Sequence, residues 1–219
     1  MEKQTGSAEA TTRELILKSA RRQFLERGFQ GASIRKIASD AGVTYGALYG
    51  YFGSKEDLFY ALTDPLVGRI MEKLDEIESA MLSLPAEKQL LGMNEAFTAR
   101  LPELVELIFE DREIVKLVIG GAKGTKYESF MSELVKRDAG AISAAAESSE
   151  TSGIHLFDGQ TLEIMMECYM AALFHLIVSG RDEQAVSQSM GLLTNVYEAG
   201  MLALMKDENH KKQSGGTRI

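Results

Sequence analysis

The sequence is poor in the features that mark secreted, membrane and metal-binding proteins. A single cysteine, Cys168, occurs among 219 residues, which excludes an intramolecular disulfide framework and any zinc site built on several cysteines. The richest apolar stretch, residues 171–178, is far shorter than the roughly 20 residues that span a bilayer. The first fifteen residues lack the apolar segment of a secretory signal. We therefore expect a protein of the reducing cytoplasm without a membrane partner.

Proline and tryptophan are also scarce, with three prolines and no tryptophan in the chain. Runs of β-branched residues with alternating polarity are missing, whereas the strong helix formers Ala, Leu, Met, Glu and Lys are plentiful. The chain is 45% hydrophobic and 26% charged, which is ordinary for a globular protein and excludes disorder of the whole chain. The composition predicts an all-α fold.

Histidine is scarce as well, and the three histidines do not favour an enzyme. The positions of His155, His175 and His210 fit neither an H-E-x-x-H site nor a Cys/His zinc site. Cys168 and His175 lie about two helical turns apart, roughly 10 Å, which is too far for a nucleophile–base pair. The glycine-rich residues 120–125 lack the spacing of a phosphate-binding loop and follow a predicted helix. We expect no enzymatic activity, no cofactor and no metal site.

Charge is spread unevenly along the chain, whose formal net charge is −8. Residues 1–60 hold nine basic and seven acidic residues, whereas the remainder holds 15 basic and 25 acidic residues. A slightly basic N-terminal segment followed by an acidic remainder indicates two domains with different functions. An excess of two basic residues is also within what chance produces, so the charge pattern does not decide the question alone.

Helix-capping residues and glycines divide the first 60 residues into short helices. Thr11 begins a capping-box pattern, and Gly28 supplies the left-handed position that ends the first helix. Ser33 is the expected N-cap of a second helix that Gly42 ends, and Thr44 is the expected N-cap of a third. Three short helices in about 40 residues, with a glycine at each sharp bend, predict a helix-turn-helix unit.

The helices predicted after this unit are longer. We expect them at residues 55–84 with a kink at Pro65, and at 86–100, 102–119, 125–149, 160–180 and 182–206. The expected domains are a helix-turn-helix domain at residues 1–54, whose residues 1–10 are flexible, a larger helical domain at 55–206, and a disordered tail at 207–219.

Many residues of the first segment match one known family in order. These residues are Ile16, Ala20, Phe24, Gly28, Phe29, Ala32, Ser33, Ile34, Ile37, Ala38, Ala41, Gly42, Val43, Thr44, Gly46, Leu48, Tyr49, Tyr51, Phe52 and Ser54 to Leu58. With them, the segment closely resembles the DNA-binding domain of TetR-family transcriptional regulators, over less than a quarter of the chain. The resemblance implies an N-terminal three-helix DNA-binding domain and a larger C-terminal helical domain for ligand binding and dimerisation. It further implies a homodimeric regulator, most often a repressor, that a small molecule releases from a palindromic operator.

The third predicted helix has two different faces. Leu48 and Phe52 form an apolar face, while the opposite face can enter a major groove, which is about 12 Å wide and accommodates one helix. The candidate DNA-binding residues are Ser33, Arg35, Thr44, Tyr45, Gly46, Ala47, Tyr49, Tyr51 and Lys55. By the resemblance, Thr44, Tyr49, Tyr51 and Lys55 contact the DNA backbone, and Arg35, Tyr45 and Ala47 read bases. Simple packing is the alternative for the two tyrosines at 49 and 51, and a solvated surface charge is the alternative for Arg35.

Methionine and aromatic residues recur at helical spacing in the larger domain. The candidate effector-binding residues are Met93, Phe97, Tyr127, Phe130, Met131, Met166, Tyr169, Met170, Phe174 and His175. A plain apolar core explains the same pattern, and the family resemblance is what favours a pocket. We expect a mainly hydrophobic effector, neutral or cationic. The alternative is a DNA-binding helix-turn-helix protein that needs no ligand.

The last two predicted helices are amphipathic and carry small residues. These small residues are Gly191, Ala199, Gly200 and Ala203. They allow close approach of helices, so we expect the two helices to pair with those of a second copy across a two-fold axis.

Overall fold

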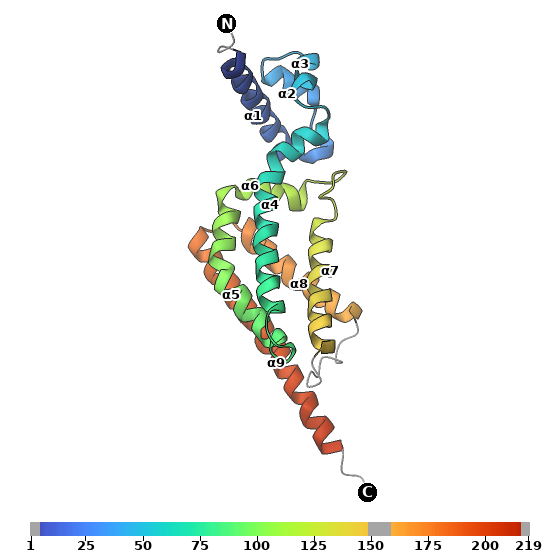
Figure 1. The fold of residues 1–219 in the computed structure, drawn as a ribbon. Coiled ribbons are helices and arrows are strands. Elements are labelled where there is room, and N and C mark those ends of the chain that lie inside the picture. Colours follow the sequence, from blue (N-terminus) through green and yellow to red (C-terminus); the bar gives the residue numbers. More distant parts are fainter. Residues whose placement is uncertain (1–4, 149–158, 216–219) are drawn as a thin grey trace. The chain divides into compact units, whose positions relative to one another are not determined.

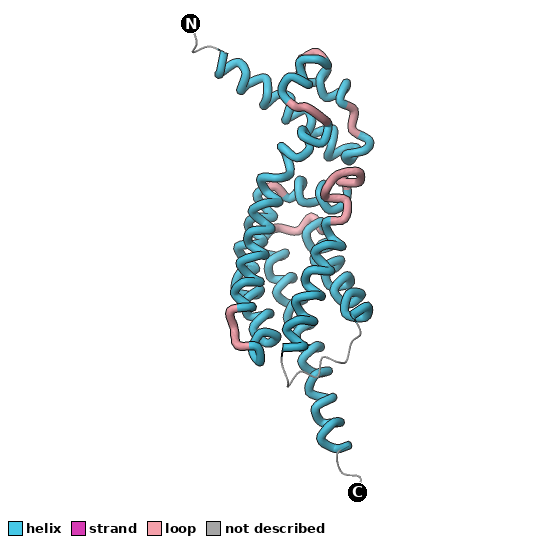
Figure 2. The backbone as a smooth tube through the Cα atoms, turned by 45° about the vertical axis from the view of Figure 1, so that its right-hand side comes forward, coloured by secondary structure: helices cyan, strands magenta, loops and turns pink. Residues whose placement is uncertain are grey.

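The protein, seen in a computed structural model, is built from helices joined by short loops (Figures 1 and 2). The structure describes residues 5–148 and 159–215, and these ranges contain no strand. The helices are α1 (Thr5–Gly31), α2 (Ile34–Asp40), α3 (Tyr45–Tyr51), α4 (Lys55–Leu82), α5 (Ala86–Glu110), α6 (Arg112–Gly120), α7 (Phe130–Ser148), α8 (Gly159–Val178) and α9 (Glu183–Gly215). The all-α prediction is confirmed.

The chain forms two compact units. Unit 1 comprises Met1–Arg69 and Asp111–Phe130, and unit 2 comprises Ile70–Glu110 and Met131–Ile219. Helix α4 therefore begins in unit 1 and continues into unit 2, and α6 belongs to unit 1 although α5 and α7 belong to unit 2. The sequence predicted a single domain boundary after residue 54. It could not predict that α6 belongs to unit 1, because contacts between distant segments leave no local signal in the sequence.

Aromatic side chains from α1 and α4 form the centre of unit 1. The ring centroids of Phe24 and Phe59 lie 5.1 Å apart, and those of Phe29 and Phe59 lie 5.3 Å apart, in edge-to-face arrangements. Ile16 and Ala20 are fully buried beside Phe24, as the four-residue spacing predicted. This geometry is favourable for aromatic pairs beyond the area they bury, so the cluster holds α1 firmly against α4.

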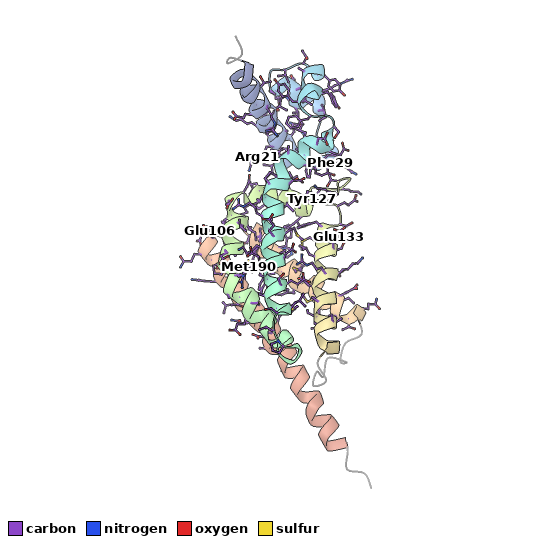
Figure 3. All side chains as sticks on the ribbon, viewed as in Figure 1. Arg21, Phe29, Glu106, Tyr127, Glu133 and Met190 are labelled. Atoms are coloured by element: carbon purple, nitrogen blue, oxygen red, sulfur yellow. The ribbon has the colours of Figure 1, made fainter. Side chains whose placement is uncertain are left out.

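Helix α6 is held against the end of α1 by two glycines. Gly28 has a φ of 65°, and the next residue, Phe29, donates its N–H to the carbonyl oxygen of Gly121 at 2.7 Å. A Cβ atom on Gly28 would lie 3.2 Å from that oxygen, so a side chain would crowd the contact and strain the backbone. Arg21 of α1, which is labelled in Figure 3, also pairs with Asp111 at 2.6 Å.

Unit 2 has its own apolar core. The core joins Leu101 and Val105 of α5, Tyr169 and Leu173 of α8, and Val186 and Met190 of α9. Figure 1 shows α5 and α9 lying side by side, and Figure 3 labels Met190 on α9. The Tyr169 and Thr194 hydroxyls lie 2.8 Å apart and are both buried, so these two polar groups satisfy each other within the core.

The prediction of a helix break near Pro102 is wrong. Helix α5 runs through Pro102 to Glu110, and the break comes at Asp111, whose carboxylate accepts the N–H of Ile114 at 3.2 Å. Pro102 removes one backbone hydrogen bond from α5. On the same helix, however, the side chains of Leu101, Leu104 and Val105 are buried in the core. Tertiary packing of that face offsets the local loss.

Three other helix ends differ from the predicted ones. Helix α1 begins at Thr5, within the segment predicted to be flexible, because Ala8, Glu9 and Ala10 are good helix formers. Helix α7 begins at Phe130, since residues 122–129 form turns around the left-handed Gly124. Helix α9 continues to Gly215, through most of the tail that was predicted to be disordered from residue 207. The polar composition of this tail argues against burial but does not exclude a helix.

Helix α8 is long and apolar enough to cross a bilayer by length and composition, over Gln160–Val178. The core helix of a globular protein passes the same test, so this is weak evidence for a membrane span. Only 22% of this segment is buried within the structure, which leaves apolar side chains such as Ile164 exposed.

Candidate DNA-binding surface

Capping side chains set the start of each short helix in unit 1. The Ser33 hydroxyl accepts the N–H of Lys36 at 3.4 Å, and the Thr44 hydroxyl accepts the N–H of Ala47 at 3.1 Å. Gly42, with a φ of 72°, makes the turn between α2 and α3. The predicted helix-turn-helix geometry is thus present, with caps at the residues that the sequence indicated.

Helix α3 stands on a buried apolar base. Leu48 is fully buried and Phe52 is 5% exposed, while Ile37 and Ala38 of α2 are buried beneath the turn. The guanidinium of Arg13 lies 5.3 Å from the centroid of the Phe52 ring, which covers the end of α3 from the side of α1. This base fixes the helix orientation and leaves its other face outward.

The outward face of α3 carries two tyrosines that contact each other. Tyr45 is 49% exposed and Tyr49 is 38% exposed, and their hydroxyl oxygens lie 3.4 Å apart. Arg35 of α2 lies with its guanidinium 5.9 Å from the centroid of the Tyr45 ring. The hydrogen bond with Tyr45 raises the pKa of Tyr49 above its ordinary value, so the Tyr49 phenol stays protonated and able to donate to phosphate or base acceptors.

Small residues leave the rest of this face open. Gly46, Ala47 and Gly50 are exposed, and apart from the neighbouring backbone of α3 itself no atom lies within 4 Å of the place where a Cβ atom of either glycine would stand. A duplex can therefore approach the backbone of α3 closely. Tyr51 is half-buried, which places it at the edge of the face.

Lys55 differs in setting from the other candidates. Its ammonium donates to the carbonyl oxygen of Gln30 at 3.2 Å and lies 4.8 Å from the centroid of the Phe29 ring. Burial lowers the pKa of Lys55, opposed by the nearby carboxylate of Glu56. The side chain thus joins the start of α4 to the end of α1, and sequence reasoning missed this internal contact because Gln30 lies 25 residues away.

Two other cations of this unit, Arg22 and Lys36, are paired with an acid of α2. Asp40 accepts from both Arg22 and Lys36, the latter at 2.8 Å. The hydrogen bond from Lys36, together with that from Arg22, holds the pKa of Asp40 below its ordinary value. Sequence reasoning did not select Arg22 or Lys36, and their pairing favours Arg35 as the cation beside the tyrosines.

Comparison with known proteins identifies this surface. Residues 16–62 match the model of bacterial regulatory proteins of the tetR family. The chain carries a TetR-family DNA-binding domain. The match begins at the buried Ile16 of α1 and ends in the first turns of α4, so it contains every helix that builds the surface.

Curated relatives match this chain over the same segment. The transcriptional repressor AcnR of Corynebacterium efficiens is 39% identical over 72 residues, which are 33% of this chain and 38% of the relative. The transcriptional repressor BepR of Brucella suis is 40% identical over 75 residues, which are 34% of each chain. The matched segment thus spans well under half the length of these curated relatives.

Solved structures extend the similarity of fold to most of the chain. A TetR-like regulator from Rhodococcus sp. RHA1 has a TM-score of 0.54 and 20% identity, covering 86% of this chain and 96% of that one. A regulator from Aquifex aeolicus has a TM-score of 0.51 and 19% identity, covering 85% and 99%. The TetR-like fold, with an N-terminal helix-turn-helix and a larger helical C-terminal part, is confirmed.

The residues predicted to bind an effector are distributed over both units. Phe97, Met166, Tyr169 and Met170 belong to the core of unit 2 or pack against it. Tyr127 and Phe130 belong to unit 1. The remaining members are Met131 and Phe174, both partly buried, His175, which is exposed, and Met93, whose side chain lies outside the described residues.

Tyr127 has a polar role within unit 1 of this TetR-like chain. Its hydroxyl donates to Asp64 of α4 at 2.7 Å, and its ring lies 6.1 Å from that of Tyr60 in an edge-to-face arrangement. Lys126 pairs with the other oxygen of Asp64 at 2.7 Å and lies over both rings. Burial, with the bond to Asp64, raises the pKa of Tyr127 strongly, so the phenol remains a donor at any physiological pH.

Proposed function

We propose that this chain is a homodimeric transcriptional repressor of the cytoplasm that binds a palindromic operator and leaves it when a small, mainly hydrophobic effector binds. The observation that carries the proposal is the outward face of α3, with Tyr45, Tyr49 and Arg35 on a rigid apolar base within a TetR-family segment. A helix presented in this way fits the major groove of DNA.

Exposed apolar side chains support the dimer. Leu192 and Val196 of α9, one helical turn apart, are 69% and 67% exposed, and Ile164 of α8 is 52% exposed. Gly200 continues the α9 stripe, and no atom lies within 4 Å of its Cβ position. Large apolar residues gathered on two neighbouring helices are typical of a surface that another chain covers.

The composition of the unit 2 core supports a hydrophobic effector. Phe97, Met166 and Met170 are only partly buried where they pack against Tyr169 and Leu173. Methionine side chains are unbranched and flexible, so they rearrange around a guest molecule at low cost. An effector acts on DNA binding only if it prefers one conformation of the dimer over another.

The path from effector to DNA surface follows the chain connectivity. Unit 2 joins unit 1 at three places: within α4 after Arg69, before Asp111, and after Phe130. The segment 111–130 is held inside unit 1 by the Asp111–Arg21 pair and the Tyr127–Asp64 bond. In this proposal, a displacement of α5 or α7 reaches unit 1 through the covalent chain at residues 111 and 130, in a segment that is bonded to α1 and α4.

Selection of bound DNA from a random library tests the proposal. The wild-type chain should enrich a palindrome whose half-sites lie about one helical turn apart or slightly more. Tyr45→Ala should change the preferred base at one position in each half-site, and Tyr45→Phe separates the role of the hydroxyl from that of the ring. Enrichment of no sequence, or of sites without two-fold symmetry, would contradict the proposal.

A further inference from the structure

One carboxylate in unit 2 lies on an otherwise apolar helix face. Asp138 of α7 comes three residues after Val135 and four before Ile142, both of which are buried, and it precedes the buried Ala139. Residues three and four apart share one face of a helix, so Asp138 belongs to the face that α7 turns toward the core. The side chain itself is partly buried.

The neighbouring cation is already engaged elsewhere. Arg137 bonds two acids of α4, with its Nη1 atom 2.7 Å from Asp75 Oδ1 and its Nε atom 2.8 Å from Glu78 Oε2. Asp138 makes no hydrogen bond or ion pair with any residue that the structure describes. Desolvation of a carboxylate that makes no hydrogen bond costs folding free energy; the charge of Arg137 offsets part of that cost and the charge of Glu78 adds to it.

Two side chains of α8 on this side of the core, Met166 and Tyr169, do not pair with Asp138. Met166 packs against Ala139 and Ile142 on one side and against the larger core on the other. The Tyr169 hydroxyl already bonds Thr194 at 2.8 Å. Burial, to which the charge of Asp138 adds, raises the pKa of Tyr169 to about 12, so the ring stays neutral beside the carboxylate.

We propose that Asp138 is the anchor for the positive charge of an apolar organic cation that binds in unit 2. This inference rests on the proposed effector function and names the chemical class of the effector. A cationic group satisfies the unpartnered carboxylate, while Met166, Tyr169 and Phe97 contact the apolar body of the ligand. A metal ion fits less well, because the described residues contain no group of three His, Cys, Asp or Glu side chains arranged to hold one.

Two ions of the same size and opposite charge test this assignment. Binding of tetraphenylphosphonium and tetraphenylborate to the full-length chain is measured by calorimetry. The wild type should bind the cation at least about tenfold more tightly than the anion, as expected for one ion pair formed away from water. Asp138→Asn should lose about tenfold in affinity for the cation, and Asp138→Glu should keep the preference.

Glu133→Gln is the matched control for the loss of one negative charge. Glu133 lies on the same helix, α7, but is exposed (Figure 3). This variant should bind the cation like the wild type. Circular dichroism of each variant shows that the fold is kept.

Three results would overturn the inference: equal binding of the two ions, cation preference kept in Asp138→Asn, or no binding of either ion to the wild type. Operator binding is measured on the same preparations, which separates the two proposals. If the chain binds its operator but shows no preference for the cation, only the proposed role of Asp138 is refuted. A chain that binds no operator refutes the proposed function whatever the ions do.

Discussion

At the scale of single residues, the structure separates side chains that maintain the fold from those free to act. On the candidate DNA-binding surface, Tyr45 and Tyr49 are exposed and lie against each other, with Arg35 beside Tyr45, whereas Lys55 is bonded to Gln30 and lies against Phe29. If Lys55 also contacts DNA as predicted, its substitution has two measurable effects, one on stability and one on DNA affinity.

Replacing Lys55 with alanine should therefore weaken binding to all DNA sequences alike. Loss of one phosphate contact reduces the slope of log affinity against log salt by about one. The preferred base at each position should stay the same, because the ammonium reads no base edge. Lys116→Ala, which removes a cation from α6 within the same unit, is the control. A changed base preference with an unchanged salt slope would show that Lys55 reads bases.

Asp138→Asn should stabilise the protein at pH 8 and not at pH 4. Burial raises the pKa of Asp138 to about 6 from an ordinary value of 3.8, with Arg137 opposing and Glu78 assisting the shift. The folded state thus holds this proton more tightly than the unfolded state. The wild type is therefore most stable below pH 4 and loses stability as the pH rises through 6. At pH 8 the free energy of unfolding of Asp138→Asn should exceed that of the wild type by about 1–3 kcal/mol, with partial exposure of the side chain reducing the difference.

Urea unfolding of wild type and variant at both pH values measures this difference. Glu133→Gln, an exposed carboxylate of the same helix, serves as the control. Equal stability of wild type and Asp138→Asn at pH 8 would mean that water or another group solvates the carboxylate.

At the scale of one element, α3 is a short helix with little stability of its own. It has seven residues, of which Gly46 and Gly50 each lower helix stability by roughly 1 kcal/mol relative to alanine. Its orientation depends on Leu48 and Phe52 below and on the Thr44 cap at its start. Small changes at these few positions should consequently have large effects on DNA binding.

Thr44→Ala should destabilise unit 1 by about 1 kcal/mol, because the N–H of Ala47 loses its acceptor. Thr44→Ser keeps the hydroxyl and should retain nearly all the stability. Thermal unfolding followed by circular dichroism compares the two variants. Equal midpoints for Thr44→Ala and the wild type would mean that water replaces the cap without cost.

Gly50→Ala should act in the opposite direction. No atom lies within 4 Å of the position its Cβ would take, so alanine fits without strain and stabilises the helix by roughly 0.5–1 kcal/mol. The same thermal measurement should show a higher midpoint. A lower midpoint would indicate that the backbone at residue 50 departs from a regular helix in solution.

At the scale of the whole molecule, we predict that the exposed apolar stripe of Leu192 and Val196 on α9 is the surface of the proposed dimer. Leu192→Glu combined with Val196→Glu should convert a dimer to a monomer of 24.1 kDa, because two buried carboxylates in each copy would face each other. Light scattering measures the mass, and operator affinity should fall with it. Leu15→Glu, at an exposed position of α1, is the control and should remain dimeric. A wild-type monomer at micromolar concentration would refute the dimer.

The sequence alone determined the helix-turn-helix unit, because its signals act over three or four residues. Ser33 and Thr44 cap the helices that follow them, Gly42 makes the turn between them, and the spacing of Leu48 and Phe52 marks the buried face. The caps, the turn and the buried face each depend on residues close together in the chain, so local sequence patterns predict them.

Only the tertiary structure decided the features that join distant segments. The Tyr127–Asp64 bond spans 63 residues and places in unit 1 a tyrosine that the sequence assigned to effector binding. Packing of α5 carries the helix through Pro102, and the pairing of Arg137 with α4 leaves Asp138 without a partner. These outcomes depend on which helices pack against each other. That packing is determined by contacts between residues far apart in the chain, so local sequence patterns do not reveal it.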